Sequence, residues 1–354
     1  MKSLLVTGGA GFIGSCFVRR LLVSSPEKHN VINLDALTYA GNLENLKLAE
    51  NNQRYIFIKG DICDRSLLEK IFSKYEIDGV INFAAESHVD RSIENPEEFI
   101  RTNIMGTQAL LDAAKKYWKL NSSDKYCAQY RDGVKFIQVS TDEVYGELGP
   151  SGLFSESTPL SPNSPYSASK ASADLLALAY HNTFGLPINV TRCSNNYGPY
   201  QFPEKLIPLM INNCLNDKPL PVYGNGLQVR DWLHVEDHCE AILAVLEKGN
   251  NGEIYNIGGN CERTNIEVVK AILKILKKPE SLISYVKDRP GHDKRYAINN
   301  AKIKNNLGWA PKHTFETGID ETIDWYLKNE EWLNRVVNGK YTDYYERMYG
   351  EKNE

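Results

Sequence analysis

A glycine-rich turn near the N-terminus restricts what this chain can fold into more than any other feature of its sequence. Thr7-Gly8-Gly9-Ala10-Gly11-Phe12-Ile13-Gly14 follows the strand-like run 4–7, and a helical pattern follows from Ser15. Glycine allows the tight turn, lets the backbone approach a pyrophosphate, and admits close packing of helix on strand, while the helix N-terminus supplies positive potential. Read as Gly9-x-Gly11-x-x-Gly14 or as Gly8-x-x-Gly11-x-x-Gly14, the spacing predicts a dinucleotide-binding turn.

Asp35 supports this prediction and indicates which dinucleotide is bound. It ends the second strand-like run, 21 positions after Gly14, close to where an acidic residue meets the ribose. A carboxylate there accepts hydrogen bonds from a ribose 2′-hydroxyl and repels a 2′-phosphate, and no arginine adjoins it. We therefore expect NAD rather than NADP.

The order of secondary structure predicts an α/β fold. Strand-like runs at 4–7, 31–34, 55–58, 79–84, 134–140 and 187–192 alternate with longer amphipathic stretches. This alternation is typical of βαβ units, so we expect a Rossmann-type, doubly wound parallel sheet. The clearest helix begins at Asn95-Pro96-Glu97-Glu98 and is predicted to reach about Lys119.

A smaller α+β lobe is expected after Asn195, where the pattern becomes less regular. Thr264 and Glu267 form the capping box of a helix predicted to reach about Lys278, and a last helix is expected near 318–337. We predict an NAD-binding domain over residues 1–194, together with about 233–259. The remainder, 195–232 and 260–354, is predicted to be the substrate-binding domain.

Composition excludes several classes of protein. The 354 residues carry a formal net charge of −4, and no basic block is long enough for a nucleic-acid footprint. The mean hydropathy is −0.42, and no apolar run approaches the roughly 18 residues of a membrane span. Seven cysteines without a C-x-x-C pair, and an N-terminus without room for a signal peptide, favour a cytoplasmic protein with reduced thiols.

One pair of histidines has the spacing of metal ligands. His234 and His238 are four positions apart at an expected helix start. The intervening residues do not complete an H-E-x-x-H motif, and no third ligand is apparent. We therefore predict no metal site.

A candidate acid–base set follows the fifth strand-like run. Thr141, Asp142 and Glu143 place a hydroxyl beside two adjacent carboxyl groups, although a solvated turn carries such residues as well. Tyr166 and Lys170 are four apart and share one face of a helix, so the ammonium is expected to lie near the phenol and to favour its ionised form. A tyrosine shifted in this way is a usable base near neutral pH.

Two further strand ends are expected near the cofactor, because ligands of a doubly wound sheet bind beyond the carboxyl ends of its strands. Asp61 and Ile62 follow the third run and would meet the adenine, or Asp61 simply caps a helix. Phe83-Ala84-Ala85-Glu86-Ser87 ends the fourth with small residues. Small residues suit a backbone that passes close to a cofactor, and they equally suit tight packing.

At these residues the sequence resembles the extended short-chain dehydrogenase/reductase superfamily. Within it, residues 140–146 (Ser-Thr-Asp-Glu-Val-Tyr-Gly), 194–199 and 202–208 look like those of the dTDP-glucose 4,6-dehydratases. The resemblance covers residues 4 to about 309. Epimerases and reductases of the superfamily share the turn, the hydroxyl and the tyrosine–lysine pair but generally lack the Asp142-Glu143 pair, which is the discriminating feature.

The resemblance implies a redox-neutral hydro-lyase that converts a nucleotide-linked glucose to its 4-keto-6-deoxy form through transient NADH. Tyr166, helped by Thr141 and Lys170, would remove the proton of the 4-hydroxyl. Glu143 would take the proton from carbon 5, and Asp142 would protonate the departing 6-hydroxyl. One carboxyl must be ionised while its neighbour is protonated, which requires environments that separate their pKa values.

The resemblance also implies the binding residues. Those expected at a tightly held NAD are Gly8, Gly11, Phe12, Ile13, Gly14, Asp35, Leu37, Thr38, Asp61, Ile62, Phe83, Ala84, Ala85, Ser87, Thr102, Tyr166, Lys170 and Asn196. Those expected at the nucleotide-diphosphate sugar are Ser87, Thr141, Asn195, Lys205, Leu206, Pro221, Val222, Tyr223, Arg230, Asn265, Arg289 and His292. A homodimer is implied as well, joined through the helices around 95–118 and 165–184 in a four-helix bundle.

Three alternatives stay open at this point. A UDP-glucose 4,6-dehydratase would carry the same Thr-Asp-Glu motif and differ in how it recognises the base. A nucleotide-sugar 4-epimerase needs only to rotate and reduce the ketone, so Asp142 and Glu143 argue against it. A non-catalytic NAD-sensing module would typically lose Tyr166 or Lys170, and this chain has both.

Overall fold

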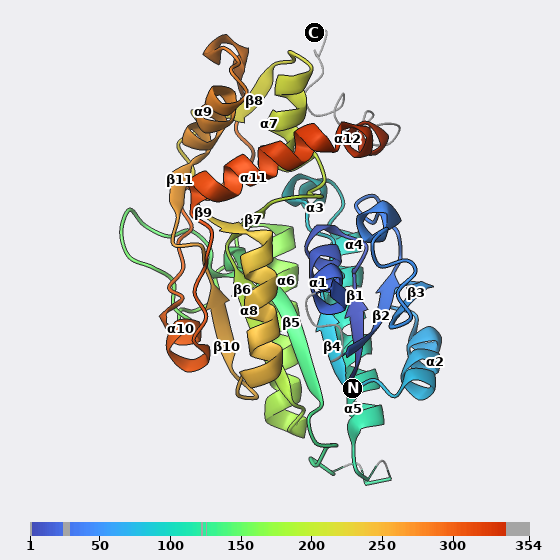
Figure 1. Cartoon of the computed structure of the whole chain (residues 1–354). Coiled ribbons are helices and arrows are strands. Elements are labelled where there is room, and N and C mark those ends of the chain that lie inside the picture. Colours follow the sequence, from blue (N-terminus) through green and yellow to red (C-terminus); the bar gives the residue numbers. More distant parts are fainter. Residues whose placement is uncertain (1, 24–28, 122, 125, 338–354) are drawn as a thin grey trace.

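A computed structural model of the chain describes residues 2–23, 29–121, 123–124 and 126–337 (Figure 1). Its central feature is a seven-stranded sheet in the order β10-β6-β5-β4-β1-β2-β3, in which all neighbouring strands are parallel. The strands are β1 (Lys2–Thr7), β2 (His29–Asp35), β3 (Tyr55–Lys59), β4 (Gly79–Asn82), β5 (Lys135–Thr141), β6 (Ile188–Cys193) and β10 (Ile254–Ile257). The predicted α/β fold with a Rossmann-type sheet is confirmed.

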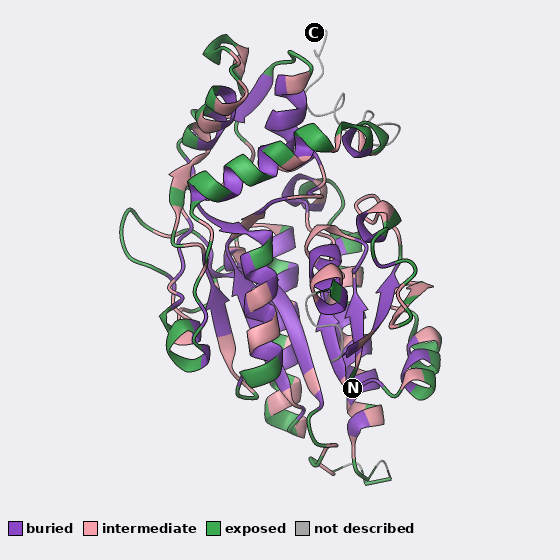
Figure 2. Ribbon diagram, viewed as in Figure 1, coloured by how far each residue is buried: buried purple, intermediate pink, exposed green. Residues whose placement is uncertain are grey.

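Helices cover both faces of this sheet, because consecutive residues of its strands are apolar and point to opposite sides, so both sides need partners. On one face, Leu4 and Val6 of β1 pack in a buried cluster with α1 (Phe12–Val23), α8 (Val235–Lys248) and α10 (Ala301–Leu307). On the other, Leu5 packs in a cluster with α2 (Arg65–Tyr75), α5 (Thr107–Trp118) and α6 (Pro165–Phe184). Figure 2 shows the strands buried along most of their length.

The strand order reverses between β1 and β4, and this reversal positions the site. From β1 the chain moves outward to β2 and β3, whereas from β4 it moves the opposite way to β5, β6 and β10. Loops that leave neighbouring strands in opposite directions open a crevice at the carboxyl ends of those strands. The glycine-rich turn after β1 and the small residues after β4 meet there.

The helix predicted over 95–119 is divided rather than regular. It consists of α4 (Pro96–Phe99), a π-helical turn (Ile100–Gly106) and α5. The wide turn lies where the helix passes the loop after β3, and a Cβ on Gly106 would lie 2.4 Å from Cδ1 of Ile62. Such turns often occur at functional sites, and here the turn carries Thr102 into the crevice.

A second lobe lies above the sheet in the view of Figure 1. Its strands are β7 (Asn195–Tyr197), β8 (Leu220–Tyr223), β9 (Val229–His234), β11 (Glu262–Thr264) and β12 (Ile283–Val286), which form a three-stranded sheet in the order β11-β9-β7 and a parallel β8–β12 pair. Its helices are α7 (Leu206–Leu215), α9 (Asn265–Ile275), α11 (Phe315–Lys328) and α12 (Glu330–Val336), while α3 (Val89–Glu94) precedes α4. A separate hydrophobic cluster holds this lobe together.

Two predicted helix ends in the lobe are corrected by the structure. The capping box of Thr264 and Glu267 is confirmed, but α9 ends at Ile275, and Lys277 adopts a left-handed φ of 54°. The last helix is two helices, α11 and α12, broken at Asn329. Residues 338–354 of the predicted substrate-binding domain lie outside the described residues, as do residues 1, 24–28, 122 and 125 of the predicted NAD-binding domain.

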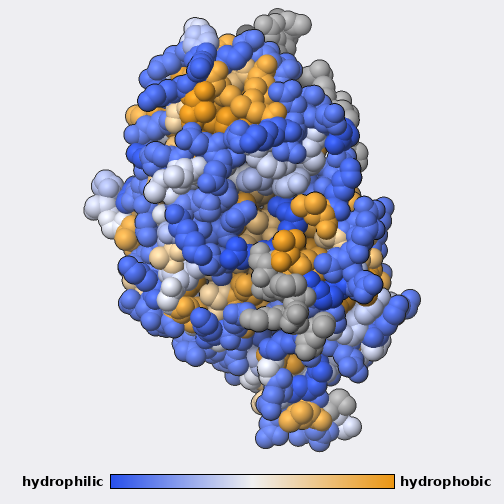
Figure 3. All heavy atoms as spheres, viewed as in Figure 1, coloured by the Kyte–Doolittle hydropathy of each residue, from blue (hydrophilic) through white to orange (hydrophobic). Residues whose placement is uncertain are grey.

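The surface in this view is mostly hydrophilic, with a hydrophobic patch at the top, over the lobe (Figure 3). Among the described helices, none combines the length and apolar character needed to cross a membrane.

Candidate active site

A cavity opens beyond the carboxyl ends of β1, β2, β4, β5 and β6, where the sheet reverses its order. Seventeen of the 18 residues predicted at the cofactor line it, namely Gly8, Gly11, Phe12, Ile13, Gly14, Asp35, Thr38, Asp61, Ile62, Phe83, Ala84, Ala85, Ser87, Thr102, Tyr166, Lys170 and Asn196. The remaining one, Leu37, lines a neighbouring cavity instead. A single crevice therefore collects segments that span most of the first 200 residues.

The turn after β1 accepts only glycine at two positions. Gly8 has a left-handed φ of 66°, and a Cβ there would lie 2.7 Å from the backbone nitrogen of Ala84. A Cβ on Gly14 would lie 2.3 Å from the carbonyl oxygen of Gly8. The turn packs closely against the start of α1, so the backbone at the N-terminus of this helix is open to the cavity. A helix N-terminus in this position suits a pyrophosphate.

Asp35 ends β2 with its carboxylate held in a fixed orientation. Oδ2 accepts a hydrogen bond from the Ala10 amide and Oδ1 accepts one from the Leu37 amide, each at 2.8 Å. The side chain is buried, and burial raises its pKa despite these two amides. Each oxygen keeps a second lone pair, so the group can still accept a ribose hydroxyl.

Asp61 does not cap a helix, so that alternative is wrong. Asp64 is the N-cap of α2 and accepts from the Leu67 amide. Asp61 instead accepts from the Cys63 amide at 2.8 Å and pairs with Arg101, whose Nη2 lies 2.6 Å from Oδ2. Both members of this ion pair line the cavity.

The candidate acid–base residues converge on the same cavity from two elements. Thr141, Asp142 and Glu143 form the end of β5 and the 3-10 turn after it, and the Thr141 hydroxyl accepts from the Glu143 amide at 3.2 Å. Tyr166 and Lys170 lie in the first turns of α6. That helix begins sharply because Ser164 provides a capping box and Pro165 follows it.

The two adjacent carboxyl groups have different surroundings. Asp142 is 1% exposed, its Oδ2 has no hydrogen-bond partner among the described residues, and burial together with Glu143 and Asp231 raises its pKa well above the usual range. Burial also raises the pKa of the half-buried Glu143, but the positive charges of Arg289, Lys205 and Arg230 oppose the rise. Asp142 therefore favours the protonated form more strongly than its neighbour does.

The sequence predicted that Lys170 lowers the pKa of Tyr166, but the groups of the protein raise this pKa instead. Burial and the Glu143 carboxylate raise the pKa of Tyr166 well above its usual value, while a hydrogen bond with Thr141 lowers it only in part. The Lys170 ammonium donates to the carbonyl of Val139 at 2.6 Å. The prediction that Lys170 lowers the phenol's pKa overlooked burial, which also lowers the pKa of Lys170 itself.

The predicted substrate residues fall into two groups. Ser87, Thr141, Asn195 and Lys205 line the cavity, whereas Leu206, Pro221, Val222, Tyr223, Arg230, Asn265, Arg289 and His292 lie outside that lining in the second lobe. The two groups are linked electrostatically, because the charges of Arg230 and Arg289 reach Glu143. Asp90 joins them further: its Oδ2 accepts from the Tyr223 hydroxyl at 3.3 Å, and its Oδ1 lies 3.5 Å from Nη1 of Arg289.

Several lining residues escaped the sequence prediction. They are Ala36, Ala40, Gly41, Glu86, Glu98, Arg101, Val139, Ser140, Cys193, Ser194, Gln201, Phe202 and Glu204. Ser194 could have been found by extending the run 187–192 by two positions, and Ser140 already ends the run 134–140. Glu204 gave no such signal, because its partner Arg91, at 3.3 Å, is distant in sequence.

Comparison with known proteins identifies the family. The family model described as GDP-mannose 4,6 dehydratase matches residues 5–322. A dTDP-glucose 4,6-dehydratase of Xanthomonas campestris is 57% identical over 350 residues, which cover 96% of this chain and 97% of that protein. The chain belongs to the dTDP-glucose 4,6-dehydratase family. The predicted resemblance, and with it the prediction of a hydro-lyase, is confirmed.

Solved structures of the family support the same assignment. The dTDP-glucose 4,6-dehydratase of Bacillus anthracis, in complex with NAD, is 54% identical with a TM-score of 0.85, and the match covers 95% of this chain and 100% of that one. The Streptomyces venezuelae dTDP-glucose 4,6-dehydratase, with NAD and TYD bound, is 48% identical with a TM-score of 0.88, covering 94% and 99%. The sheet and the lobe are thus features of the dTDP-glucose 4,6-dehydratase family.

The protonated state of Asp142 can be tested through stability. The pKa of Asp142 is raised in the folded protein, so its carboxyl contributes fully to the free energy of unfolding below its unfolded pKa near 3.8. That contribution is lost as the pH rises through the pKa of the folded state. Asp142→Asn stays neutral throughout, so the variant should unfold at higher urea than wild type at pH 7, with the gap closing toward pH 4. Asp320→Asn, on the exposed face of α11, is the control. A variant less stable than wild type at pH 7 would contradict a buried, protonated Asp142.

Proposed function

We propose that this chain converts dTDP-glucose to dTDP-4-keto-6-deoxyglucose and water, with NAD retained through each turnover. The observation that carries the proposal is the unequal carboxyl pair after β5: a buried Asp142 that favours its proton, beside a Glu143 whose ionised form is supported by three cations. Elimination of water needs one acid and one base within reach of the same sugar. The pair supplies both, in one cavity with Tyr166.

NAD fits the residues at the other end of the cavity. The turn of Gly8, Gly11 and Gly14 would cradle the pyrophosphate, since a Cβ on Gly8 or Gly14 would clash with backbone, and Asp35 would hold the ribose. When bound, NAD supplies an electron-pair acceptor for carbon 4 and, in its oxidised form, a positive charge. Asp61 and Ile62 would border the adenine.

Tyr166 is proposed to remove the proton of the sugar's 4-hydroxyl. Its phenol bonds with Thr141 and lies close enough to Glu143 for their charges to interact. Because burial and Glu143 both favour the neutral phenol, Tyr166 acts as a base only when positive charge is added near it. Oxidised NAD would add that charge when bound, whereas the Lys170 ammonium, one helical turn further along α6, donates to the carbonyl of Val139 and would hold the cofactor end of the site.

Glu143 and Asp142 are proposed to carry out the elimination. Oxidation at carbon 4 acidifies the hydrogen on carbon 5, which Glu143 removes while Asp142 gives its proton to the departing 6-hydroxyl. Asp142 has a proton to give because its carboxyl is buried without cationic neighbours of equal strength. After water leaves, carbon 5 is protonated again and carbon 6 is reduced, which closes a redox-neutral cycle.

The second lobe is proposed to hold the nucleotide diphosphate. Lys205, Arg230 and Arg289 would meet the phosphate oxygens, since guanidinium forks match them well and an ammonium acts as a point charge. Arg230 is 5% exposed and is held by two backbone carbonyls, those of Val229 at 2.8 Å and Asp293 at 2.9 Å. A rigid cation of this kind fixes the position of the ligand.

We further propose the two-domain division of the sequence prediction, with one change. The lobe's own hydrophobic cluster, which contains Tyr197, Trp232 and α9, supports a substrate-binding domain built from both predicted segments. Helix α10 belongs with the NAD-binding domain, because Ile303 and Leu307 pack in the cluster on the sheet. We also propose that the reaction takes place in the cytoplasm, which suits seven cysteines that are all free thiols.

Product identification tests the function directly. Incubation with dTDP-glucose in deuterated water should give the 4-keto-6-deoxy sugar with deuterium at carbon 5 and no net NADH. The same assay with UDP-glucose is the control for base recognition. We expect kcat/KM for UDP-glucose to be lower by about tenfold or more, because it lacks the methyl group of thymine and carries an additional ribose hydroxyl. An epimerised hexose, or equal rates with both substrates, would contradict the proposal.

The role of Glu143 is tested by Glu143→Gln, which keeps the shape of the side chain and removes the base. We expect kcat to fall by about 10²–10⁴, with NADH absorbance accumulating on the enzyme because oxidation at carbon 4 still occurs. Tyr166→Phe is the matched comparison and should give no NADH signal in a single turnover. Normal turnover by Glu143→Gln would remove this residue from the mechanism.

We also propose that two copies pair through α6 and the helices before it. Helices α5 and α6 lie side by side, and the Tyr180 hydroxyl of α6 donates a hydrogen bond to Asp112 of α5 at 2.7 Å. Large apolar side chains project from them into solvent: Leu175 is 57% exposed, Met105 59% and Ile100 51%. Such a surface fits a second copy that presents the same helices, which is the predicted four-helix bundle.

Light scattering after gel filtration tests this interface. Wild type should have twice the 40.1 kDa of one chain, and Leu175→Glu should reduce it to one chain, because a carboxylate would then face its own copy across the interface. Leu227→Glu, at a similarly exposed leucine in the second lobe, should leave the dimer intact. A monomeric wild type would overturn the proposal.

A further inference from the structure

Two histidines and a glutamate meet where α8 and α11 approach each other, outside the active-site cavity. His234 ends β9 and precedes α8, His313 lies in the segment between α10 and α11, and Glu321 belongs to α11. One ligand atom from each lies within 4.8 Å of the others. None of the three lines the active-site cavity.

His234 is a buried side chain with unused hydrogen-bonding capacity. It is 3% exposed, and neither ring nitrogen has a hydrogen-bond partner among the described residues. Its ring lies against that of His313, with ring centres 4.0 Å apart. Buried polar atoms are nearly always partnered, by protein, ordered water or an ion, because desolvation without a partner is costly. An imidazole in this position has a lone pair available for a ligand.

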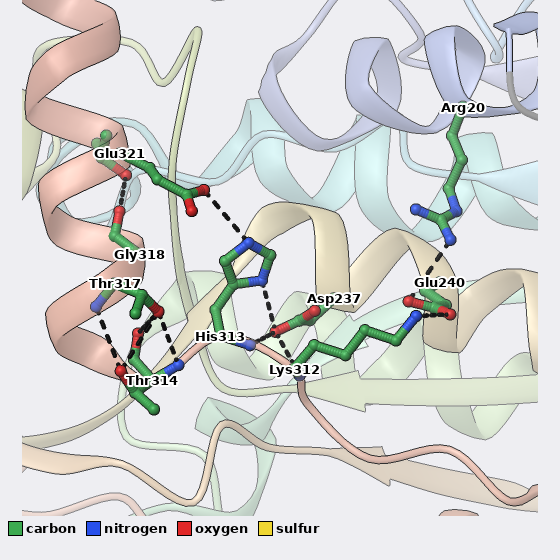
Figure 4. Close-up of polar contacts among 10 residues, drawn as sticks. Arg20, Asp237, Glu240, Lys312, His313, Thr314, Thr317, Gly318 and Glu321 are labelled. Atoms are coloured by element: carbon green, nitrogen blue, oxygen red, sulfur yellow. Dashed lines mark hydrogen bonds and ion pairs between the residues drawn. The ribbon is translucent and has the colours of Figure 1, made fainter.

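His313 is held from both sides by carboxylates (Figure 4). Its Nδ1 lies 3.1 Å from Oδ2 of Asp237, and its Nε2 lies 3.4 Å from Oε2 of Glu321. Asp237 is itself fixed, because the same oxygen accepts from the amides of Lys312 and His313. Nδ1 of His313 makes no hydrogen bond in the described part of the chain. A small rotation of the ring would let it donate to Asp237, which is the arrangement that orients a metal-binding histidine.

We propose that His234, His313 and Glu321 bind one Zn²⁺ ion, with Asp237 positioning His313 and water at the fourth place. Nitrogen and oxygen ligands lie about 2.0–2.1 Å from a tetrahedral zinc ion, so two such ligand atoms are about 3.4 Å from each other. The distance between Nε2 of His313 and Oε2 of Glu321 already has that value. Glu321 is 61% exposed on its side chain and is free to adjust toward His234.

The ion would connect the junction of β9 and α8 to α11 rather than take part in the reaction. His234 precedes a helix that packs on the main sheet, and Glu321 lies on a helix of the second lobe. The sequence prediction of no metal site considered only His234 and His238. In the structure, Nδ1 of His238 lies 2.8 Å from Oδ1 of Asn196, and the other ligands come from more than 70 positions further along the chain.

Metal titration of the full chain, freed of any affinity tag and of metal, tests the site. Calorimetry with Zn²⁺ should give one ion per chain, and Tm should rise as free Zn²⁺ rises, because an ion that binds the folded state stabilises it. Co²⁺ in place of Zn²⁺ should give the intense visible absorption of a tetrahedral site. Absence of binding at micromolar Zn²⁺ would overturn the proposal.

Variants locate the ion. Glu321→Gln changes an exposed side chain, so the protein should fold, and we expect at least tenfold weaker Zn²⁺ binding and a smaller rise in Tm. Asp320→Asn, its exposed neighbour on α11, is the matched control and should bind as wild type does. His313→Gln should abolish the Co²⁺ absorption. Binding of equal strength in Glu321→Gln and His313→Gln would place any ion elsewhere, at a cysteine for example, and would contradict this site.

Discussion

The unequal environment of two adjacent carboxyl groups is the constraint on which the proposed chemistry of this protein depends. Asp142 and Glu143 share a backbone turn, so the fold cannot separate them in space and must separate them by their neighbours. Burial disfavours charge on both. Only Glu143 has three cations that oppose this effect, and their side chains come from the second lobe. Acid and base chemistry at neighbouring positions therefore requires that lobe, not the sheet alone.

The sheet contributes rigidity at the same point. Beneath the active-site end of α6, Asp174 and Arg192 form an ion pair at 2.9 Å with side chains 0% and 2% exposed. Arg192 also donates to the Tyr145 hydroxyl, which in turn donates to Asn256. A buried ion pair specifies one arrangement, because any other would leave a charge unpaired in the interior. The helix that carries Tyr166 and Lys170 is thereby fixed relative to β5 and β6.

The sequence predicts well what is local and poorly what depends on distant partners. The turn of Gly8 to Gly14, Asp35 and the capping box of Thr264 are written within short segments, and the structure has each of them. The break at Asn329 and the π-helical turn before α5 depend on packing against elements elsewhere in the chain. The raised pKa of Tyr166 is likewise a property of burial, which a spacing of four residues does not reveal.

Substrate charge and base strength are coupled in this site. The cations that support ionised Glu143 are those proposed to meet the diphosphate, so bound phosphate offsets part of their positive charge. The pKa of Glu143 then rises relative to the free protein, because burial is less opposed. A carboxylate with a higher pKa is a stronger base. Binding of the nucleotide in one lobe would therefore strengthen the group proposed to remove the proton at carbon 5, and a sugar without its diphosphate would lack this effect.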